Sequence, residues 1–340
     1  MGRTVCFGEI MGRLNPEGHL RIVQATKYEI SFAGGEANVA VSLSNYGIDA
    51  AFITKLPKND LGRAAANDLR KFGVDISQIV YGGDRFGLYF VEKGASQRAS
   101  KVIYDRKHSA IATAQRSDFD WDKIFEDTDW FHFTGITPAL GDNVAEICLD
   151  ACKKARQLGI TVSCDLNFRK NLWSSEKACE VMSGLMKYVN VCISNEEDAY
   201  DVFGIRAAET DLTSGSLDHE NYIDVAKQMT DRFGFDAVAI TLRTSISASD
   251  NDWAGMLYMD GKTYFSKNYS IHIVDRVGSG DSFGAALIYA FQSKLPLQES
   301  VEFATAASCL KHSIEFDFNH VTEEEVRKLM EGDGSGRVQR

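Results

Sequence analysis

Short apolar runs alternate with longer amphipathic stretches along most of this chain. The short runs have the length and β-branched character of buried strands, and several of the longer stretches end in glycine, as helices commonly do. The apolar runs lie at residues 4–10, 50–56, 129–136, 160–167, 189–195 and 237–243. Strands that alternate with helices are typical of βαβ units. The pattern therefore predicts an α/β fold with a doubly wound, mostly parallel sheet flanked by helices.

Two segments interrupt this alternation and predict a separate small sheet. Residues 12–32 contain strand-like pieces without a helical pattern, and residues 84–107 read as a hairpin whose arms are GLYFVEKG and ASKVIYDR. We expect both to pair into a small antiparallel sheet that serves as a lid or an oligomer face. Two long surface loops are the alternative, although loops of this length are uncommon. The core would then comprise residues 1–11, 33–83 and 108–340.

The composition is that of a globular protein and argues against two classes of partner. Of the 340 residues, 44% are hydrophobic and 25% are charged, and 37 basic against 48 acidic residues give a net charge of −11. Nucleic acids and anionic membranes bind basic faces, so neither is expected as a partner. No stretch approaches the roughly 18 apolar residues of a membrane helix, and the first residues lack the apolar segment of a signal peptide. We expect a cytoplasmic protein.

The seven cysteines are scattered and form no CxxC pair. Most lie in apolar runs, which favours reduced thiols in the core of a cytosolic protein. Cys148 and Cys152 are spaced for one helix face. A metal-binding pair is therefore an alternative, but no histidine or second cysteine pair joins them.

The stretch VDRVGSGDSFGAAL, residues 274–287, places a carboxylate directly behind two glycines. Gly278 and Gly280 allow a sharp turn and leave backbone N–H groups free to face an anion, helped by the dipole of the helix that follows. No lysine follows as in a P-loop, and the glycine spacing is not that of a dinucleotide site. Asp281 reads either as a helix cap, the commoner role of aspartate there, or as a catalytic base beside an anion site.

A second glycine pair lies near the start of the chain, in SFAGGEANVAVSLSNYG, residues 31–47. Gly34 and Gly35 permit close approach of the backbone to a ligand. The amide of Asn38, one turn into the predicted helix, can donate to and accept from sugar hydroxyls. A tight strand–helix turn with a half-buried asparagine is the alternative.

The two motifs, in this order and at this separation, resemble the two signatures of the ribokinase-like (PfkB) carbohydrate kinases, and the resemblance covers about residues 3–330. The stretches GEIMGRL, GLYFVEKG, VIYDR, DLNFRKNLW, ITLR and DRVGSGDSF are most similar to 2-keto-3-deoxygluconate kinases. The resemblance implies an enzyme that uses ATP and Mg²⁺ to phosphorylate this acid sugar. It implies Asp281 as general base, Gly278 and Gly280 as an anion hole, and sugar binding by Gly34, Gly35 and Asn38.

Four further residues are assigned to the acid sugar by the same resemblance. Tyr89, Tyr104 and Arg106 lie on the arms of the predicted hairpin, and Arg169 follows the run at 160–167. The carboxylate of an acid sugar needs a cation, and the guanidinium fork of arginine meets it with two hydrogen bonds. From the residues alone, both arginines read as exposed surface charges.

Two stretches depart from the family pattern, and they concern ATP and the metal. The N-x-x-E motif is replaced by SNEEDA, in which Asn195 precedes two candidate metal carboxylates, Glu197 and Asp198. The glycines of T-x-G-x-x-G are absent from TLRTSIS, so Arg243 is expected at the ATP phosphates, together with Asn195 and Ser279. Asp275 is expected either behind the anion hole or beside a monovalent-cation loop, so K⁺ stays open as a cofactor.

Two other functions remain open at this point. A neutral-sugar kinase of the same fold, such as a fructokinase, would leave the arginines without a role. A catalytically silent sugar-binding sensor would not need a base at Asp281. We also expect a homo-oligomer, formed through apolar residues of the lid at Leu88, Phe90 and Val102.

Overall fold

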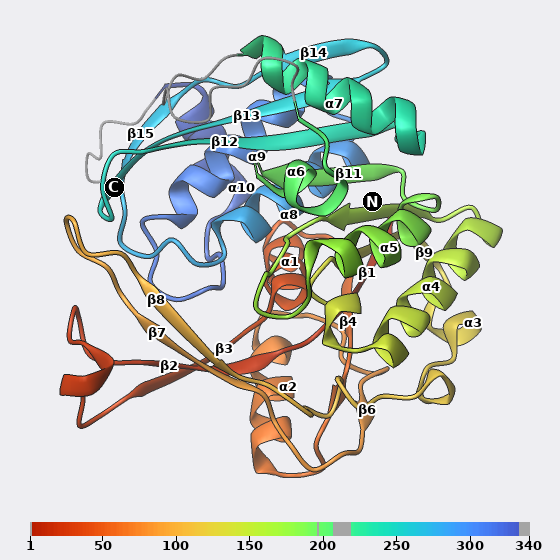
Figure 1. Ribbon diagram of the computed structural model, residues 1–340, viewed down its shortest axis with the longest axis vertical. Coiled ribbons are helices and arrows are strands. Elements are labelled where there is room, and N and C mark those ends of the chain that lie inside the picture. Colours follow the sequence, from red (N-terminus) through yellow and green to blue (C-terminus); the bar gives the residue numbers. More distant parts are fainter. Residues whose placement is uncertain (1, 196, 207–218, 333–340) are drawn as a thin grey trace.

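The protein is built around one large sheet of nine strands with helices on both faces (Figure 1). The computed structural model describes residues 2–195, 197–206 and 219–332. Six strands run parallel, in the order β4 (Ala50–Ile53), β1 (Arg3–Phe7), β9 (Thr128–Thr134), β10 (Thr161–Asp165), β11 (Val191–Asn195) and β12 (Ala237–Ser245). Three antiparallel strands complete the sheet, namely β13 (Asp250–Met259), β14 (Lys262–Phe265) and β15 (Tyr269–His272). The predicted doubly wound, mostly parallel sheet is confirmed.

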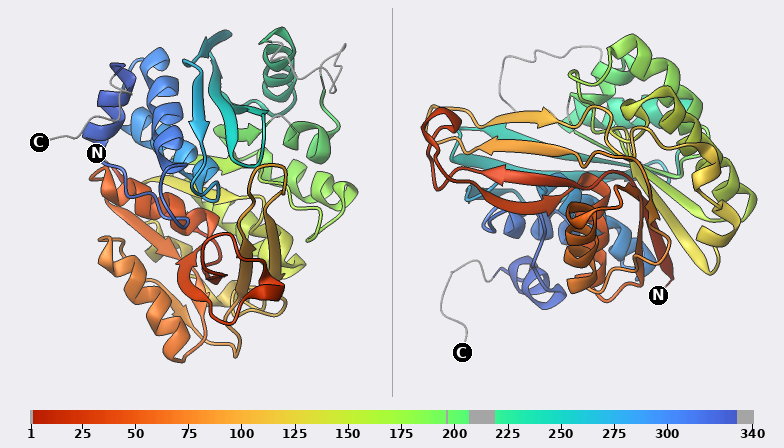
Figure 2. Two further views of the ribbon diagram at one scale, coloured as in Figure 1. Left: turned by 90° about the vertical axis from the view of Figure 1, so that its left-hand side faces the viewer. Right: turned by 90° about the horizontal axis from the view of Figure 1, so that it is seen from below.

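Helices cover both faces of this sheet (Figure 2). A hydrophobic core lies on each face, under its own helices. One face is covered by α1 (Gly35–Asn45), α2 (Asp60–Lys71), α8 (Ser279–Gln292), α9 (Leu297–Lys311) and α10 (Glu323–Met330). The other is covered by α3 (Trp121–Ile124), α4 (Asp142–Gln157), α5 (Ser175–Met186), α6 (Asp198–Phe203) and α7 (His219–Phe233). Three short 3₁₀ turns lie at Ile22–Gln24, Arg116–Asp118 and Pro138–Leu140.

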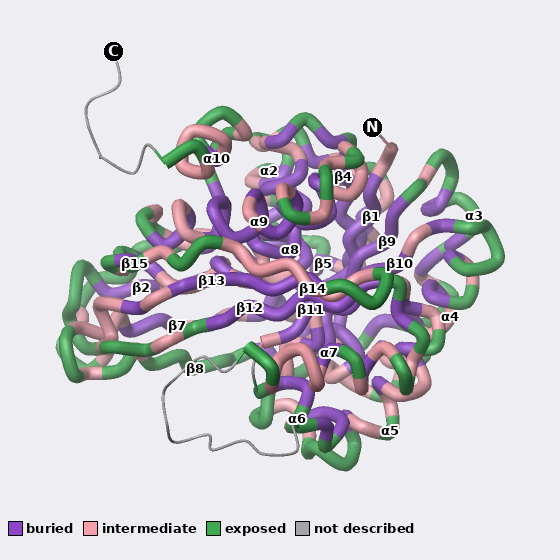
Figure 3. The backbone as a smooth tube through the Cα atoms, turned by 90° about the horizontal axis from the view of Figure 1, so that it is seen from above, coloured by how far each residue is buried: buried purple, intermediate pink, exposed green. Residues whose placement is uncertain are grey.

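Helix α8 is largely enclosed, because its sequence is apolar or small on every side. All residues from Ser282 to Ala290 are buried, and Figure 3 shows the helix deep among buried segments. Its first turn carries Asp281. The burial of the rest of the helix therefore fixes the position of this carboxylate.

A four-stranded sheet, here called the lid, projects from the core with the strand order β3 (Glu29–Ala33), β2 (Met11–Asn15), β7 (Leu88–Glu92) and β8 (Lys101–Asp105) (Figure 1). The two inserted segments pair with each other as expected, but the prediction of an entirely antiparallel sheet was wrong. Strands β2 and β7 pair in parallel. Each is the first strand of an inserted segment and leads the chain away from the core, so the two strands run in the same direction. Strands β5 (Lys55–Leu56) and β6 (Val80–Tyr81) form a separate pair.

The expected apolar face of the lid needs one correction. Val102 pairs with Val91 and lines the central cavity, whereas Phe90 pairs with Ile103. Because side chains alternate between the two faces of a sheet, Val102 and Phe90 point to opposite sides. The outer apolar face therefore carries Ile103 in place of Val102, together with Phe90 and the half-exposed Ile30.

The lid also contacts the core at its tip. Ser96, in the β7–β8 turn, donates its backbone N–H to Ser249 Oγ at 3.0 Å and accepts from the N–H of Ala248 at 2.8 Å. Lys93 forms an ion pair with Glu315. The lid is therefore attached to the core at both ends.

All seven cysteines are free, and five of them are buried. Cys148 and Cys152 lie inside a hydrophobic core, and burial raises the pKa of both thiols. Within the described residues no group of three or more metal-ligating side chains is present, so a metal site at this pair finds no support. None of the described helices has the length and apolar character needed to span a membrane.

Candidate active site

A cavity of about 440 Å³ lies where the carboxyl ends of the parallel strands meet the first turn of α8 and the inner face of the lid. Ligands of open α/β sheets bind at this edge. Of the predicted site residues, the following line the cavity: Gly34, Gly35, Asn38, Tyr89, Tyr104, Arg106, Arg169, Asn195, Asp198, Arg243, Gly278, Ser279, Gly280 and Asp281. Glu197 lines an adjoining cavity instead. The structure therefore brings together residues that are up to 247 positions apart, 281 − 34.

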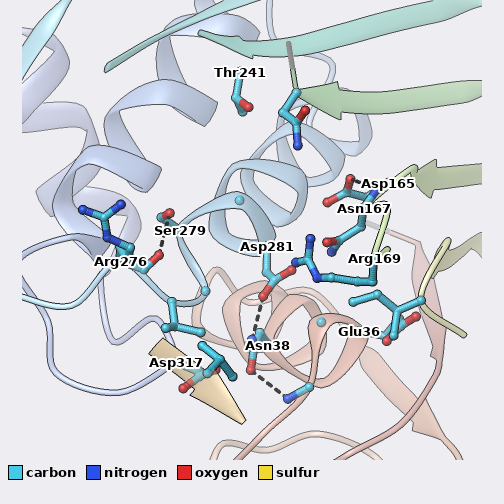
Figure 4. A pocket seen from close by; sticks show the side chains of 18 of the residues that line it. Glu36, Asn38, Asp165, Asn167, Arg169, Thr241, Arg276, Ser279, Asp281 and Asp317 are labelled. Carbon is cyan, nitrogen blue, oxygen red and sulfur yellow. Dashed lines mark hydrogen bonds between the residues drawn. The ribbon is translucent and has the colours of Figure 1, made fainter. Parts of the chain in front are cut away.

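Asp281 is held by the asparagine that follows the first glycine pair (Figure 4). Asn38 Nδ2 donates to Asp281 Oδ2 at 2.6 Å, and Asn38 Oδ1 accepts from the N–H of Gly34 at 3.3 Å. A Cβ on Gly35 would lie 3.5 Å from Asp281 Oδ1. The Asn38 amide, predicted to bind sugar hydroxyls, thus has both of its ends engaged within the protein and orients the carboxylate.

Burial raises the pKa of Asp281 to about 7. The hydrogen bond from Asn38 opposes this rise by lowering the pKa, the charges of Asp317 and Glu36 raise it further, and Arg169 lowers it. A carboxyl group with a pKa near 7 is suited to accept a proton at neutral pH, because a useful fraction is ionised and the proton is held firmly.

The backbone before Asp281 provides donors for an anion. Gly278 caps α8 with a left-handed backbone, φ 83°, and a Cβ there would lie 2.3 Å from the Asp317 carbonyl oxygen. The first N–H groups of a helix have no intrahelical acceptor, and the helix dipole is positive at this end. A Cβ on Gly280 would meet nothing within 4 Å, so this glycine keeps the approach to the N–H groups open. Both glycines fit an anion hole.

Two carboxyl groups at the ends of β10 and β11 form an acidic part of the cavity. Burial raises the pKa of Asp165 well above its usual range, and the charges of Asp198 and Asp281 add to the shift. Burial also raises the pKa of Asp198 to about 6. Asp198 Oδ2 is buried without a hydrogen-bond partner in the described structure. The backbone N–H of Asp198 donates to Asn195 Oδ1 at 2.9 Å, which fixes the start of α6.

This oxygen-rich donor set fits Mg²⁺. Magnesium is held in kinases by one or two carboxylates together with substrate phosphates, rather than by a full protein cage. Asp165 and Asp198 supply two carboxylates, one of them with an unpartnered buried oxygen. Among the described residues there is no three-ligand cluster that would suit a structural metal.

The two predicted carboxylate-binding arginines differ in their surroundings. Arg106 is buried, not exposed, and its guanidinium pairs with the buried Glu9, with Nε at 2.7 Å from Oε2. Arg169 is exposed at the cavity edge and donates to the Phe168 carbonyl at 3.1 Å. Figure 4 shows it extending from the loop after β10 toward Asp281. Within the described residues no carboxylate forms an ion pair with Arg169, although its charge acts against the burial that raises the pKa of Asp198 and Asp281.

The two tyrosines of the lid stack on each other, with ring centroids 5.8 Å apart. Tyr89 is buried and donates its hydroxyl to Asp317 Oδ1 at 2.7 Å. Tyr104 is 40% exposed and faces the cavity. Tyr104 is therefore the tyrosine whose hydroxyl is more open to a ligand.

Sequence reasoning missed several charged residues of this region. Those that line the cavity are Glu9, Glu36, Asp165, Arg276 and Asp317. Glu36 is fully enclosed, and its Oε1 accepts hydrogen bonds from Thr134 and Thr137. The position of Glu36 inside the GGEAN motif could have indicated its burial among hydrogen-bond donors, because an acidic residue in the first turn of a buried helix needs such donors.

Comparison with known proteins gives one family. The model of the pfkB family of carbohydrate kinases matches residues 1–313. A 2-dehydro-3-deoxygalactonokinase of Haloferax volcanii is 32% identical over 98% of both chains. A 2-dehydro-3-deoxygluconokinase of Bacillus subtilis is 26% identical over 91% of this chain and 89% of its own.

Solved structures agree with this result. The crystal structure of the 2-dehydro-3-deoxygluconokinase of Thermotoga maritima has a TM-score of 0.94 and 52% identity, covering 97% of this chain and 98% of that one. A putative ribokinase II of E. coli, solved with ATP and Mg²⁺, shares the fold with a TM-score of 0.79 at 17% identity, covering 97% and 99%.

Proposed function

The chain belongs to the pfkB family of carbohydrate kinases, and on this basis we propose that it phosphorylates 2-keto-3-deoxygluconate, also named 2-dehydro-3-deoxygluconate, at its terminal hydroxyl with ATP. One observation carries the assignment of the chemistry: Asp281, with its pKa raised to about 7 by burial, lies at the start of α8 beside Gly278 and Gly280. Phosphoryl transfer needs a base for the attacking hydroxyl and donors for the charge of the transferred group, and this arrangement supplies both.

In the proposed reaction, Asp281 accepts the proton of the sugar hydroxyl as that oxygen bonds to the γ-phosphorus of ATP. The bond from phosphorus to the leaving oxygen of ADP breaks in the same transfer. The N–H groups at the start of α8 stabilise the negative charge on the transferring group. Asn38 keeps the carboxylate directed at the hydroxyl.

The acid-sugar substrate is supported by Arg169. Its guanidinium lies at the cavity edge and forms no ion pair with a carboxylate among the described residues, and a bidentate pair with a substrate carboxylate would satisfy it. Arg106 would act through its remaining N–H edge while Glu9 holds it in place. The Thermotoga maritima enzyme, 52% identical, is named for the same sugar acid.

ATP and Mg²⁺ are assigned to the same cavity. We propose Asn195, Arg243 and Ser279 at the nucleotide, and Asp198 in preference to Glu197 at the metal, because Asp198 lines the main cavity with an unpartnered oxygen. Bound Mg²⁺ would neutralise charge between the ATP phosphates. Asp198 and Asp165 would hold the ion next to those phosphates.

The test is an ADP-release assay with Mg-ATP against 2-keto-3-deoxygluconate, its galactonate-derived epimer, fructose and ribose. Turnover of the acid sugars with little turnover of fructose or ribose supports the proposal. The epimer belongs in the panel because a relative at 32% identity is named for it. Turnover of fructose alone would keep Asp281 as base and reject the carboxylate site, and no turnover of any sugar would favour a silent sensor.

A further inference from the structure

A buried cluster of two cations and two carboxylates lies behind the anion hole. Arg13, on lid strand β2, has no exposed surface and donates to Asp275 Oδ2 at 2.5 Å and to Asp317 Oδ2. Lys311, the last residue of α9, is also fully buried and donates to the Ile314 carbonyl at 3.1 Å. Lysine is rarely buried unless a charge balances it, so its presence here needs an explanation that the apolar core does not provide.

The Asp275 carboxylate and the backbone of Asp317 both contact the loop that forms the anion hole. Asp275 Oδ1 accepts from the N–H of Val277 at 3.1 Å, and Asp275 Oδ2 accepts from the N–H of Phe316 at 3.2 Å. The Asp317 carbonyl lies so close to Gly278 that a Cβ there would be 2.3 Å away. The loop 275–279 and the turn 312–317 therefore support each other, and a shift in the turn moves the anion-hole loop.

The charges of the cluster balance when all four groups are ionised. Arg13 and Lys311 contribute two positive charges, and Asp275 and Asp317 two negative ones. Burial lowers the pKa of Lys311 to about 8, and the charges of Asp275 and Asp317 act against this shift, so that the ammonium form predominates at neutral pH. Without that ammonium, one uncompensated negative charge would remain inside the protein, close to Asp281 and to the place where phosphates approach. Buried charges are stable only when paired.

We propose that Lys311 is a positioning residue whose ammonium serves as a built-in monovalent cation, holding the turn 312–317 against the anion-hole loop so that phosphoryl transfer needs no free K⁺. This inference rests on the proposed kinase function, because it concerns the same anion hole. Lys311 touches neither sugar nor ATP in this scheme. It acts on turnover through Asp275, Asp317 and the backbone of Gly278.

The test uses Lys311→Ala, which removes the ammonium and leaves room for a small cation. With tetramethylammonium as the only monovalent cation, the wild type should keep full activity and the variant should lose at least about tenfold in kcat, since a buried carboxylate loses its counter-charge. Adding NH₄⁺, methylammonium or K⁺ should restore most of the kcat of the variant. Two controls accompany it: Lys311→Met, which fills the space and should not be rescued, and Lys153→Ala on the exposed side of α4, which should change nothing.

Three results would overturn the inference: wild-type activity that depends on added K⁺, unchanged kcat in Lys311→Ala, or a low kcat that no small cation restores. Thermal melting of each variant in the same buffers shows whether fold loss accounts for an activity change. The series is run with whichever sugar the wild type phosphorylates. If the wild type phosphorylates a different sugar, the proposed substrate is wrong, but the conclusion on Lys311 is still tested.

Discussion

Asn38 and Asp281 lie 243 positions apart in the chain, and a 2.6 Å hydrogen bond joins the amide of one to the carboxylate of the other. The bond links the first turn of α1 to the first turn of α8. It orients the proposed base and lowers its pKa against the larger effect of burial. Substitutions of these two residues therefore allow effects on catalysis to be measured apart from effects on folding.

Asp281→Asn should lower kcat by about 10²–10⁴-fold, the usual contribution of a positioned general base. The fold should persist and gain stability at high pH. Because the pKa of Asp281 is raised from 3.8 to about 7 in the folded state, its contribution to stability is present below pH 4 and is lost as pH rises toward and through 7. Melting temperatures at pH 5 and pH 8 test this, and a variant that melts lower than the wild type at pH 8 would contradict it.

Asn38→Ala should move the pH dependence of the reaction. Wild-type kcat/KM should rise with pH with a midpoint near 7, because Asp281 must be ionised to accept a proton. Removing the hydrogen bond that lowers this pKa should shift the midpoint to higher pH, with a lower maximum. Asn45→Ala, at the other end of α1, is a control that should leave the midpoint unchanged. An unchanged midpoint in Asn38→Ala would show that this hydrogen bond does not influence the pKa of the base.

Arg169→Ala should raise the KM for the acid sugar by about 10- to 150-fold, the equivalent of about 1.5–3 kcal/mol for hydrogen bonds to a charged group. The KM for ATP should change little. Arg169→Lys should recover only part of the loss, because lysine lacks the bidentate fork. Arg63→Ala, an exposed arginine of α2, is the control. Equal effects on both substrates would reject the carboxylate role.

Arg106→Ala should affect stability as well as sugar binding. The change leaves Glu9 buried without its cation, and breaking such a pair is expected to destabilise the fold by about 3–5 kcal/mol. Glu9→Gln combined with Arg106→Met removes both charges and should restore much of the melting temperature while the sugar KM stays high. A double variant as unstable as Arg106→Ala would show that the stability effect does not come from the stranded carboxylate.

The outer face of the lid is the proposed contact for a homo-oligomer. Ile103 and Ile30 are 40% and 50% exposed there, which suits burial against a second copy. Light scattering at micromolar concentration should give a dimer or larger even oligomer for the wild type and a monomer for Ile103→Glu. Leu158→Glu, at the end of α4 and 52% exposed, should leave the mass unchanged. A monomeric wild type would reject the proposal.

Local patterns in the sequence sufficed for most elements of the fold. Apolar runs located the parallel strands, and amphipathic stretches that end in glycine located the helices between them. The hairpin of β13 and β14 turns at Asp260 and Gly261, both with positive φ, a conformation that this dipeptide favours. The parallel pairing of β2 with β7 was not predictable in this way, because the two strands are not adjacent in sequence and either direction satisfies the alternation of each strand.

The site was predictable where a motif concentrates its chemistry in a few consecutive residues, as at Gly278–Asp281. It was not predictable where a partner comes from a distant segment. Nothing near Arg106 indicates that Glu9 pairs with it, and nothing near Lys311 indicates that its ammonium is enclosed with Asp275 and Asp317. Burial and pairing of such charges depend on tertiary packing, to which a single sequence gives no local signal.

Arg13 and Asp317 bond across 304 positions of a 340-residue chain. On the ribosome, at about 5–20 residues per second, Asp317 is made about 15–60 s after Arg13. During that interval a compact nascent chain would have to enclose an arginine without its partner, which is strongly unfavourable. The lid strand that carries Arg13 should therefore dock last, after release of the C-terminal segment, so that truncated chains keep an open and unreactive site.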